Sequence, residues 1–361
     1  MYFGLSEDQI FFQDNIKKFL EENSSVDILR KIAADDRTFA KDIHDGIVNL
    51  GINGLLVPEE FGGLGLDILF AAAISESLGY GAGATPFIGS YVMAPIAIID
   101  GGSDEQKQKY LTKIVSNEVK FGVGFSALTG ARDNSEIQIK GNKISGRSLF
   151  VLDYEYATHF LISDINGCIG IIDSQANGID LVELKTIDRT RNVCELILKN
   201  VDFEILEQTK NSKNTAEKVI DAGRIMLAAD SLGAAQNMID KAVDYAKERK
   251  QFGRAIGSFQ AVKHMCAEMV AELEPCYALV WHAAHAQKHM PDEARLMACH
   301  AKSHLSDVTK EVAKKSTEVH GGMGFTDLLG LHYWFKRIGL NRQLLGSPER
   351  IREEAAYLQL N

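Results

Sequence analysis

The sequence predicts an α+β protein in three parts: an N-terminal helical domain (1–118), a central antiparallel β-domain (119–205) and a C-terminal antiparallel helix bundle (206–361). The first observation behind this prediction is a change of period. Apolar residues recur at helical spacing in the first part, alternate with polar residues after about Val119, and return to helical spacing from Thr215. The second is length, because 361 residues exceed the size at which one hydrophobic core stops growing.

Capping residues mark two helix starts in the first part. Ser6 forms a capping box with Gln9 three residues later, and Ser103 precedes acidic residues that favour a first helical turn. The first helix is expected to bury an apolar stripe made of Ile10, Phe11, Ile16 and Phe19.

A β-hairpin is predicted where the second part begins. Residues 136–140 and 143–145 alternate in polarity on either side of Gly141-Asn142, which can form a turn. Further short strands are expected at 160–163, 168–172, 181–184 and 193–198. Because their connections are too short for crossover helices, the sheet is expected to be antiparallel.

The third part is predicted to consist of long helices. They are expected at 215–248, 258–289 and 292–319, with a shorter helix after Pro348, since proline is tolerated in a first helical turn. Short connections between them favour antiparallel neighbours.

The composition argues against several classes of function. A formal charge of −10 without a dense basic stripe argues against nucleic acid as a partner. Five cysteines without CxxC spacing indicate reduced thiols in a cytoplasmic protein. The sequence contains no uninterrupted run of about 18 apolar residues, the length that a membrane-spanning helix needs. His282, His285 and His289 share a helix face, but no carboxylate matches them, so a polar face is favoured over a metal site.

A basic and aromatic elbow, residues 248–260, joins two of the long helices. Phe252 and Gly253 break the helical period, and Gly253 is expected to turn the chain sharply. Arg249 can grip a phosphate through two N–H groups, Gln251 offers an amide, and Phe252 offers a ring for stacking. Gln260 lies on the next helix. The elbow suits a nucleotide-like ligand, but a solvated charge pair beside a hydrophobic helix cap explains the same residues.

Two segments resemble the C-terminal signatures of the acyl-CoA dehydrogenase family: KERKQFGRAIGSFQAVKHMCAEM (247–269) and EVHGGMGFT (318–326). Further segments match the family in order: GINGLLVPEEFGGLGLD (51–67), GSDEQKQKYL (102–111) and ELILKNVDFE (195–204). The resemblance therefore covers nearly the whole chain.

This resemblance implies a cofactor and a reaction. FAD binds at a dimer interface of the family, and an acyl-CoA thioester lies against the flavin. A glutamate removes the α-proton while the β-hydrogen leaves as hydride to the flavin, and the electrons pass to an electron-transferring flavoprotein. A carboxylate with a raised pKa, hydrogen bonds to the thioester carbonyl and a dry pocket suit this reaction.

The half of the FAD site that the family supplies across the interface, here named the trans half, is largely retained. The residues expected to bind the cofactor in it are Arg249, Gln251, Phe252, Gln260, Glu318, Gly321, Gly322 and Gly324. Arg249 matches the arginine at the pyrophosphate, and the glycine turn lets backbone amides approach a ligand closely. Glu318 replaces the family's glutamine and brings a negative charge near an anionic cofactor.

The half supplied within the same chain, here named the cis half, is largely absent. Residues 129–134 read TGARDN where the family reads Thr-Glu-Pro followed by Gly-Ser-Asp, and Thr129 is kept as an expected cofactor contact. Residues 150–153 read FVLD where the family reads Trp-Ile-Thr-Asn, with the threonine hydroxyl at flavin N5. Leu152 takes that position and cannot donate a hydrogen bond.

Neither of the family's two positions for the catalytic base holds an acid. One falls at Leu345, just before Gly346, and the other at Gly223, just before Arg224. Asp221 lies two residues from Gly223 and is expected on another face of the helix. The sequence therefore offers no catalytic residue.

The expected function is that of an acyl-CoA dehydrogenase subunit. It would give the trans half of an FAD site to a related catalytic subunit in a heterotetramer, with steroid-type CoA esters as candidate substrates. Two alternatives stay open: a homotetrameric dehydrogenase with a relocated base, and a flavin-free binding or scaffold protein of the same fold.

Overall fold

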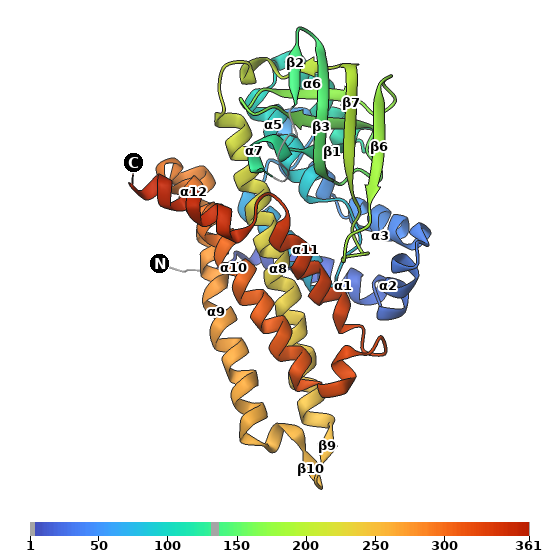
Figure 1. The fold of residues 1–361 in the computed structure, drawn as a ribbon, viewed down its shortest axis with the longest axis vertical. Coiled ribbons are helices and arrows are strands. Elements are labelled where there is room, and N and C mark those ends of the chain that lie inside the picture. Colours follow the sequence, from blue (N-terminus) through green and yellow to red (C-terminus); the bar gives the residue numbers. More distant parts are fainter. Residues whose placement is uncertain (1–3, 131–136, 361) are drawn as a thin grey trace.

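The computed structural model describes residues 4–130 and 137–360. It has an α+β fold in which a sheet sits at one end of a long helix bundle and the N-terminal helices pack beside both (Figure 1). The N-terminal elements are α1 (Glu7–Asn23), α2 (Val26–Ala33), α3 (Arg37–Asn49), η1 (Ile52–Gly54), η2 (Glu59–Phe61), α4 (Ile68–Tyr80), the π-helical η3 (Ile88–Met93), α5 (Ala94–Gly101) and α6 (Asp104–Val115). Among the described residues, every helix is too short or too polar to span a lipid bilayer.

Both predicted helix starts are confirmed. The N–H of Gln9 donates to Ser6 Oγ (3.3 Å), and the N–H of Ser6 donates back to Gln9 Oε1 (2.8 Å). Ser103 and Gln106 form the same reciprocal pair at the start of α6. Each box satisfies two backbone donors that a helix start leaves without partners.

The apolar stripe predicted for α1 is wrong in part. Ile10 and Phe11 are exposed, whereas Gln13 is buried. Gln13 Nε2 donates to Ala73 O (3.2 Å) and to Glu76 Oε2 (3.0 Å) on α4. A polar pair therefore occupies part of the helix contact, and period alone cannot reveal it.

The central sheet is mixed, so the prediction of a purely antiparallel sheet is wrong. Its strands are β1 (Phe121–Gly124), β2 (Gln138–Lys140), β3 (Lys143–Leu152), β4 (His159–Ser163), β5 (Ile169–Asp173), β6 (Ile179–Leu184), β7 (Val193–Asp202) and β8 (Glu204–Ile205). The order is β6-β7-β3-β1-β4-β5-β8, with β2 beside β3 and β1 parallel to β4. The chain between β1 and β4 carries the short helix α7 (Ser126–Thr129) and the predicted hairpin, and this excursion lets β4 return parallel to β1.

The bundle contains one helix more than predicted. Its elements are η4 (Glu207–Thr209), α8 (Asn214–Glu248), β9 (Lys250–Gln251), β10 (Arg254–Ala255), η5 (Ile256–Ser258), α9 (Gln260–His289), α10 (Pro291–Val319), η6 (Gly321–Phe325), α11 (Leu331–Gln343) and α12 (Pro348–Leu360). The unpredicted helix, α11, buries Arg337 and Asn341 next to Trp334. Buried polar residues hide the apolar period by which a helix is recognised.

A buried ion pair explains why α11 carries those polar residues. Arg337, 1% exposed, donates to Asp230 on α8 through Nε (2.9 Å) and Nη2 (2.6 Å). Its Nη1 donates to Gly83 O (3.1 Å) and to Thr190 Oγ1 (3.2 Å), and Asn341 Nδ2 donates to Asp230 Oδ1 (2.6 Å). Burial opposes ionisation of Asp230, but the facing guanidinium outweighs it and lowers the pKa of Asp230. The pair and its hydrogen bonds therefore connect the N-terminal part, the β-domain and the helix bundle.

Replacing Arg337 by methionine is expected to lower the free energy of unfolding by about 3–5 kcal/mol, because it leaves Asp230 buried without its main counter-charge. Thermal or denaturant unfolding of the variant measures the loss. The double variant Arg337→Met with Asp230→Leu is the control and should be clearly more stable than Arg337→Met alone. A double variant no more stable than the single one would contradict the assignment.

Candidate functional site

The elbow contains a short β-hairpin with a two-residue turn, at the tip of the bundle. Strands β9 and β10 pair with Gln251 opposite Arg254, so Phe252 and Gly253 form the turn. Both have positive φ, +53° and +80°, as a type I′ turn requires. The prediction of a sharp turn at Gly253 is confirmed, but the left-handed conformation of Phe252 was not predicted, since bulky residues rarely adopt it.

Packing under the turn leaves the predicted cofactor residues exposed, although Gln251 Nε2 donates to Lys250 O (2.9 Å). The guanidinium of Arg254 lies 4.0 Å from the Phe259 ring centre, and the Phe252 ring meets Phe259 edge-on at 6.1 Å. Phe252 is nevertheless 92% exposed. Arg249 and Gln251 are also exposed, and within the described residues no side chain pairs with the Arg249 guanidinium.

The glycine turn follows α10 as the 3₁₀ segment η6. Gly321, at φ +58°, and Gly322 have no atom near the place where a Cβ would stand, so their backbone is open to a ligand. Gly324 is needed for the fold instead, since a Cβ there would lie 2.5 Å from Thr317 O. Glu318 is exposed in the last turn of α10, and no ion pair involving it occurs among the described residues.

A contact between two aromatic rings brings the glycine turn and the elbow to the same end of the bundle. Tyr245, one helical turn before Arg249, lies against His320 with ring centres 4.6 Å apart, and His320 directly precedes Gly321. Gln260 opens α9 at the same end (Figure 1). Seven of the eight predicted residues of the trans half are therefore exposed at this end of the bundle, and Gly324 is buried beneath them. Tyr245 and His320, which no sequence pattern indicated, support this arrangement.

Thr129 does not join them. It ends α7 beside the sheet, is 4% exposed, and its Oγ1 donates to Phe125 O (3.3 Å). The next residue, Gly130 at φ +67°, is exposed, but Arg350 of α12 lies against it, so a Cβ there would be 1.9 Å from Arg350 Nη1. Positions 131–134 of the predicted loop lie outside the described residues.

The end of β3 turns its polar group inward. Leu152 is 5% exposed, and one carboxylate oxygen of Asp153 accepts the N–H groups of Phe87 (3.0 Å), Gly89 (2.6 Å) and Ser90 (3.0 Å). Asp153 therefore ties the sheet to η3. Its carboxylate is committed to the fold.

The family's two positions for a base contact each other. A Cβ on Gly223 would lie 2.5 Å from Leu345 Cδ1 and 2.8 Å from Met93 Sδ, so the leucine fills the space above the glycine. Leu345 adopts φ +57°, a conformation that bulky residues rarely take, and its carbonyl accepts Arg224 Nε (3.1 Å). Both positions are apolar, and neither side chain can accept a proton.

Asp221, the carboxylate nearest in sequence, points elsewhere. Its carboxylate lies 3.5 Å from Arg295 Nη1 and 3.8 Å from Arg224 Nη1. Burial raises the pKa of Asp221 to about 7, and the two arginines only partly offset this effect. It belongs to a buried charge cluster between α8, α10 and α12 that also contains Glu354.

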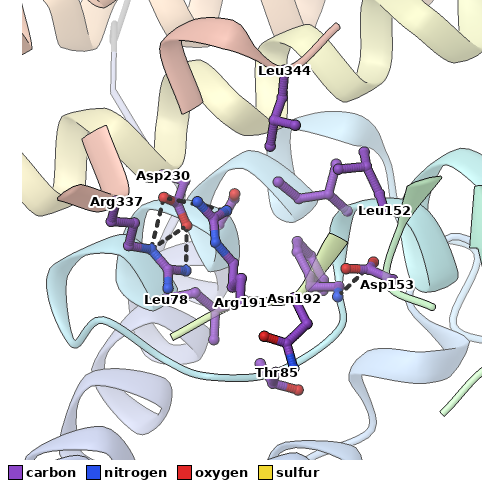
Figure 2. A pocket seen from close by; sticks show the side chains of 12 residues that line it. Leu78, Thr85, Leu152, Asp153, Arg191, Asn192, Asp230, Arg337 and Leu344 are labelled. Carbon is purple, nitrogen blue, oxygen red and sulfur yellow. Dashed lines mark hydrogen bonds and ion pairs between the residues drawn. The ribbon is translucent and has the colours of Figure 1, made fainter. Parts of the chain in front are cut away.

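A small cavity remains between these features. It has a volume of about 20 Å³ and is lined by Ser75, Leu78, Thr85, Phe87, Ile88, Leu152, Asp153, Arg191, Asn192, Asp230, Arg337 and Leu344. Figure 2 shows Leu344 entering it from the bundle side and Leu152 from the sheet side, with the Arg337–Asp230 pair in its wall. That volume holds a water molecule or two.

The two halves therefore differ in their fit to FAD. The cavity between Leu152 and Leu344 has no room for a three-ring flavin, and Leu152 offers it no donor. The exposed tip offers an unpaired guanidinium, an aromatic ring and open glycine amides, the groups that a pyrophosphate and an adenine ring need. No group of three potential metal ligands occurs in the part of the chain that the structure describes.

Gly223→Ala is expected to destabilise the protein by about 1–3 kcal/mol, because the new methyl group overlaps Leu345. In a Leu345→Ala background the same change should cost clearly less, and thermal unfolding of the four proteins measures this coupling. Gly233→Ala on the same helix is the matched control. Its methyl group would meet the backbone of Glu76 at 1.8 Å, which Leu345→Ala cannot relieve. Additive effects of Gly223→Ala and Leu345→Ala would contradict the contact.

Comparison with known proteins agrees with this geometry. Residues 6–118 match the model of the acyl-CoA dehydrogenase N-terminal domain, and residues 214–357 match that of the C-terminal domain. The short-chain specific acyl-CoA dehydrogenase of Clostridium acetobutylicum is 30% identical over 351 residues, which cover 90% of this chain and 91% of that protein.

Two solved structures share the fold. The ChsE4-ChsE5 complex from Mycobacterium tuberculosis superposes with a TM-score of 0.88 at 22% identity, over 100% of both chains. The Tcur3481-Tcur3483 steroid ACAD, as a G363A variant, gives 0.86 at 24% identity, over 98% of both. The family models, the ordered motifs and the shared fold together establish that this chain belongs to the FAD-dependent acyl-CoA dehydrogenase family.

Proposed function

We propose that this chain is a catalytically incomplete subunit of a heteromeric acyl-CoA dehydrogenase and gives the trans half of an FAD site to a related catalytic subunit. One observation carries the proposal. The cavity beside Leu152, the position that matches the family's flavin-facing threonine, measures only about 20 Å³, while most of the expected nucleotide-binding residues are exposed at the far end of the bundle. The assembly would be a heterotetramer with fewer FAD molecules than chains.

The trans half suits the nucleotide end of the cofactor. Arg249 can form two charge-assisted hydrogen bonds to a pyrophosphate, and it has no competing partner among the described side chains. Gly321 and Gly322 leave their backbone amides accessible to further phosphate oxygens. Phe252 presents a bare ring for stacking. Each group is idle in the chain alone and gains a role when a neighbour brings FAD.

In the reaction this chain would bind and orient the nucleotide end of FAD, and its partner would perform the proton transfer. FAD supplies the hydride acceptor when it is bound. Leu345 and Gly223 stand where the family keeps its base and have no group that accepts a proton. The partner subunit must therefore provide both the base and the flavin-facing pocket.

The substrate is proposed to be an acyl-CoA thioester, with a steroid-type ester as the finer assignment. The structural similarity to a steroid ACAD and to the ChsE4-ChsE5 complex supports both the ester class and a two-chain assembly. We further propose an electron-transferring flavoprotein as the electron acceptor and a cytoplasmic location, the latter in keeping with five free cysteines. Domain boundaries at 118/119 and 205/206 are part of the same proposal.

No observation favours either alternative function. A homotetramer with a relocated base would need a carboxylate at the cavity, but Asp221 lies against Arg295, and Asp153 is held by three backbone amides. A flavin-free scaffold would have no use for an unpaired guanidinium beside an open glycine turn.

Arg249→Ala in the assembled complex tests the proposal. Loss of a charge-assisted contact worth about 1.5–3 kcal/mol should weaken FAD binding about tenfold to a hundredfold. The measurement is a titration of FAD into apo-complex purified from its own cells through a tag on this chain. Lys247→Ala is the matched control, because it removes a positive charge from the same helix end while Lys247 pairs with Asp244 (3.5 Å).

Leu345→Glu in the isolated chain gives a second arm. It should produce no dehydrogenation, because the cavity still lacks room for the flavin and the new carboxyl would be buried and protonated. Unchanged FAD affinity in Arg249→Ala, or turnover by Leu345→Glu, would show that the two half-sites have been assigned to the wrong subunits.

A further inference from the structure

We propose that Arg30 of α2 is a positioning residue for the trans half, because it fixes the loop 326–330 that follows the glycine turn. The inference rests on the proposed function and extends it to the N-terminal part of the chain. Arg30 is 297 positions away from Asp327 in the sequence, and the fold brings them into contact.

The guanidinium of Arg30 holds this loop at three points. Its Nε donates to Asp327 Oδ2 (2.6 Å), and its Nη2 donates to the carbonyl oxygen of Asp327 and to Leu328 O (3.1 Å). The remaining Nη1 donates to Asp27 Oδ1 (2.5 Å), one turn earlier on α2. A planar guanidinium can satisfy several acceptors at once, whereas a lysine ammonium has no fixed fork.

A second contact presses the other end of the loop against α2. A Cβ on Gly330, at φ +64°, would lie 2.5 Å from Val26 Cγ1, so only glycine allows this approach. The loop is therefore in contact with α2 at Asp327 and Leu328 and again at Gly330. Helix α11 begins at Leu331, directly after the held segment.

Two hydrogen bonds join the loop to the glycine turn. Thr326, the first loop residue, binds Met323 O through its N–H (3.0 Å) and its Oγ1 (2.7 Å). Met323 lies inside η6, between Gly322 and Gly324. Any movement of Asp327 is therefore passed to the backbone whose amides would bind phosphate.

Holding the loop also keeps two apolar side chains outward. Phe325 is 81% exposed and Leu328 is 73% exposed, at the same end of the bundle as Phe252. Exposed side chains of this size add nothing to the stability of the chain alone. A held loop lowers the ordering cost when a partner subunit and its nucleotide dock, and this effect raises affinity without any new contact.

A merely structural ion pair predicts a different outcome. The Arg30 side chain is 31% exposed and that of Asp327 60% exposed. Pairs this accessible to water contribute little to global stability. Removing the pair should therefore leave the melting temperature nearly unchanged while it weakens nucleotide binding.

The test uses the tagged complex purified from its own cells, stripped of flavin and titrated with FAD. Arg30→Ala is expected to weaken FAD binding about three- to tenfold, and Arg30→Lys to restore part of the loss. Hydrogen exchange at the backbone amides of 326–330 should become faster in Arg30→Ala. Asp27→Ala is the matched control, because among the described residues Asp27 is the partner of Arg30 that lies outside the loop, and its loss should leave FAD affinity unchanged.

Asp327→Asn is the second variant, and it should weaken FAD binding in the same direction at an unchanged melting temperature. If Arg249→Ala weakens FAD binding and Arg30→Ala does not, the positioning role of Arg30 is overturned and the proposed function stands. If neither variant weakens it, the proposed function fails as well. Losses that track the melting temperature in both Arg30→Ala and Asp327→Asn would reduce Arg30 to a structural residue and overturn the inference.

Discussion

The buried Arg337–Asp230 ion pair is the interaction on which the arrangement of the three parts depends. Two charges removed from water are tolerated only when both are fully paired, so every group around this pair is tightly constrained. Gly83, Thr190 and Asn341 complete it from three different segments of the chain. The pair also forms part of the wall of the central cavity between the sheet and the bundle.

Within that frame, leucines decide what the cavity can hold. Leu152 and Leu344 occupy it from opposite sides, and Leu345 covers Gly223. Burying each leucine stabilises the fold by roughly 1.5–3 kcal/mol, whereas a buried carboxylate or threonine without its ligand would cost free energy. Under the proposed function, in which the partner subunit performs catalysis, apolar substitutions at these positions stabilise this chain and remove no activity that it needs.

At the tip of the bundle, by contrast, large apolar side chains are exposed to solvent. Phe252 is exposed and held at positive φ, and Phe325 and Leu328 also face solvent. Strained and exposed apolar residues are costly to a single chain and persist where a function requires them. Burial of the cis half and exposure of the trans half are the two observations on which the proposed division of roles between subunits rests.

Sequence patterns predicted the long helices, the capping boxes and the β2–β3 hairpin, because each rests on local spacing. They failed where contacts between distant residues determine the structure. Helix α11 was not predicted because its buried face carries the polar residues Arg337 and Asn341, and the parallel pairing of β1 with β4 follows a long connection. Family motifs indicated the residues of both half-sites. They could not reveal that Gly223 and Leu345 touch, or that Arg30 holds the loop after the glycine turn, because these contacts join segments far apart in the chain.

The flavin content of this chain expressed and purified without any partner tests the central claim most directly. The account predicts an almost colourless protein that binds little FAD and gives no turnover of acyl-CoA with an artificial electron acceptor. Circular dichroism should show a folded, helix-rich protein, so that misfolding is excluded as the reason for a low flavin content. A yellow protein with one FAD per chain and measurable turnover would contradict the account, since a complete site would then exist within copies of this chain alone.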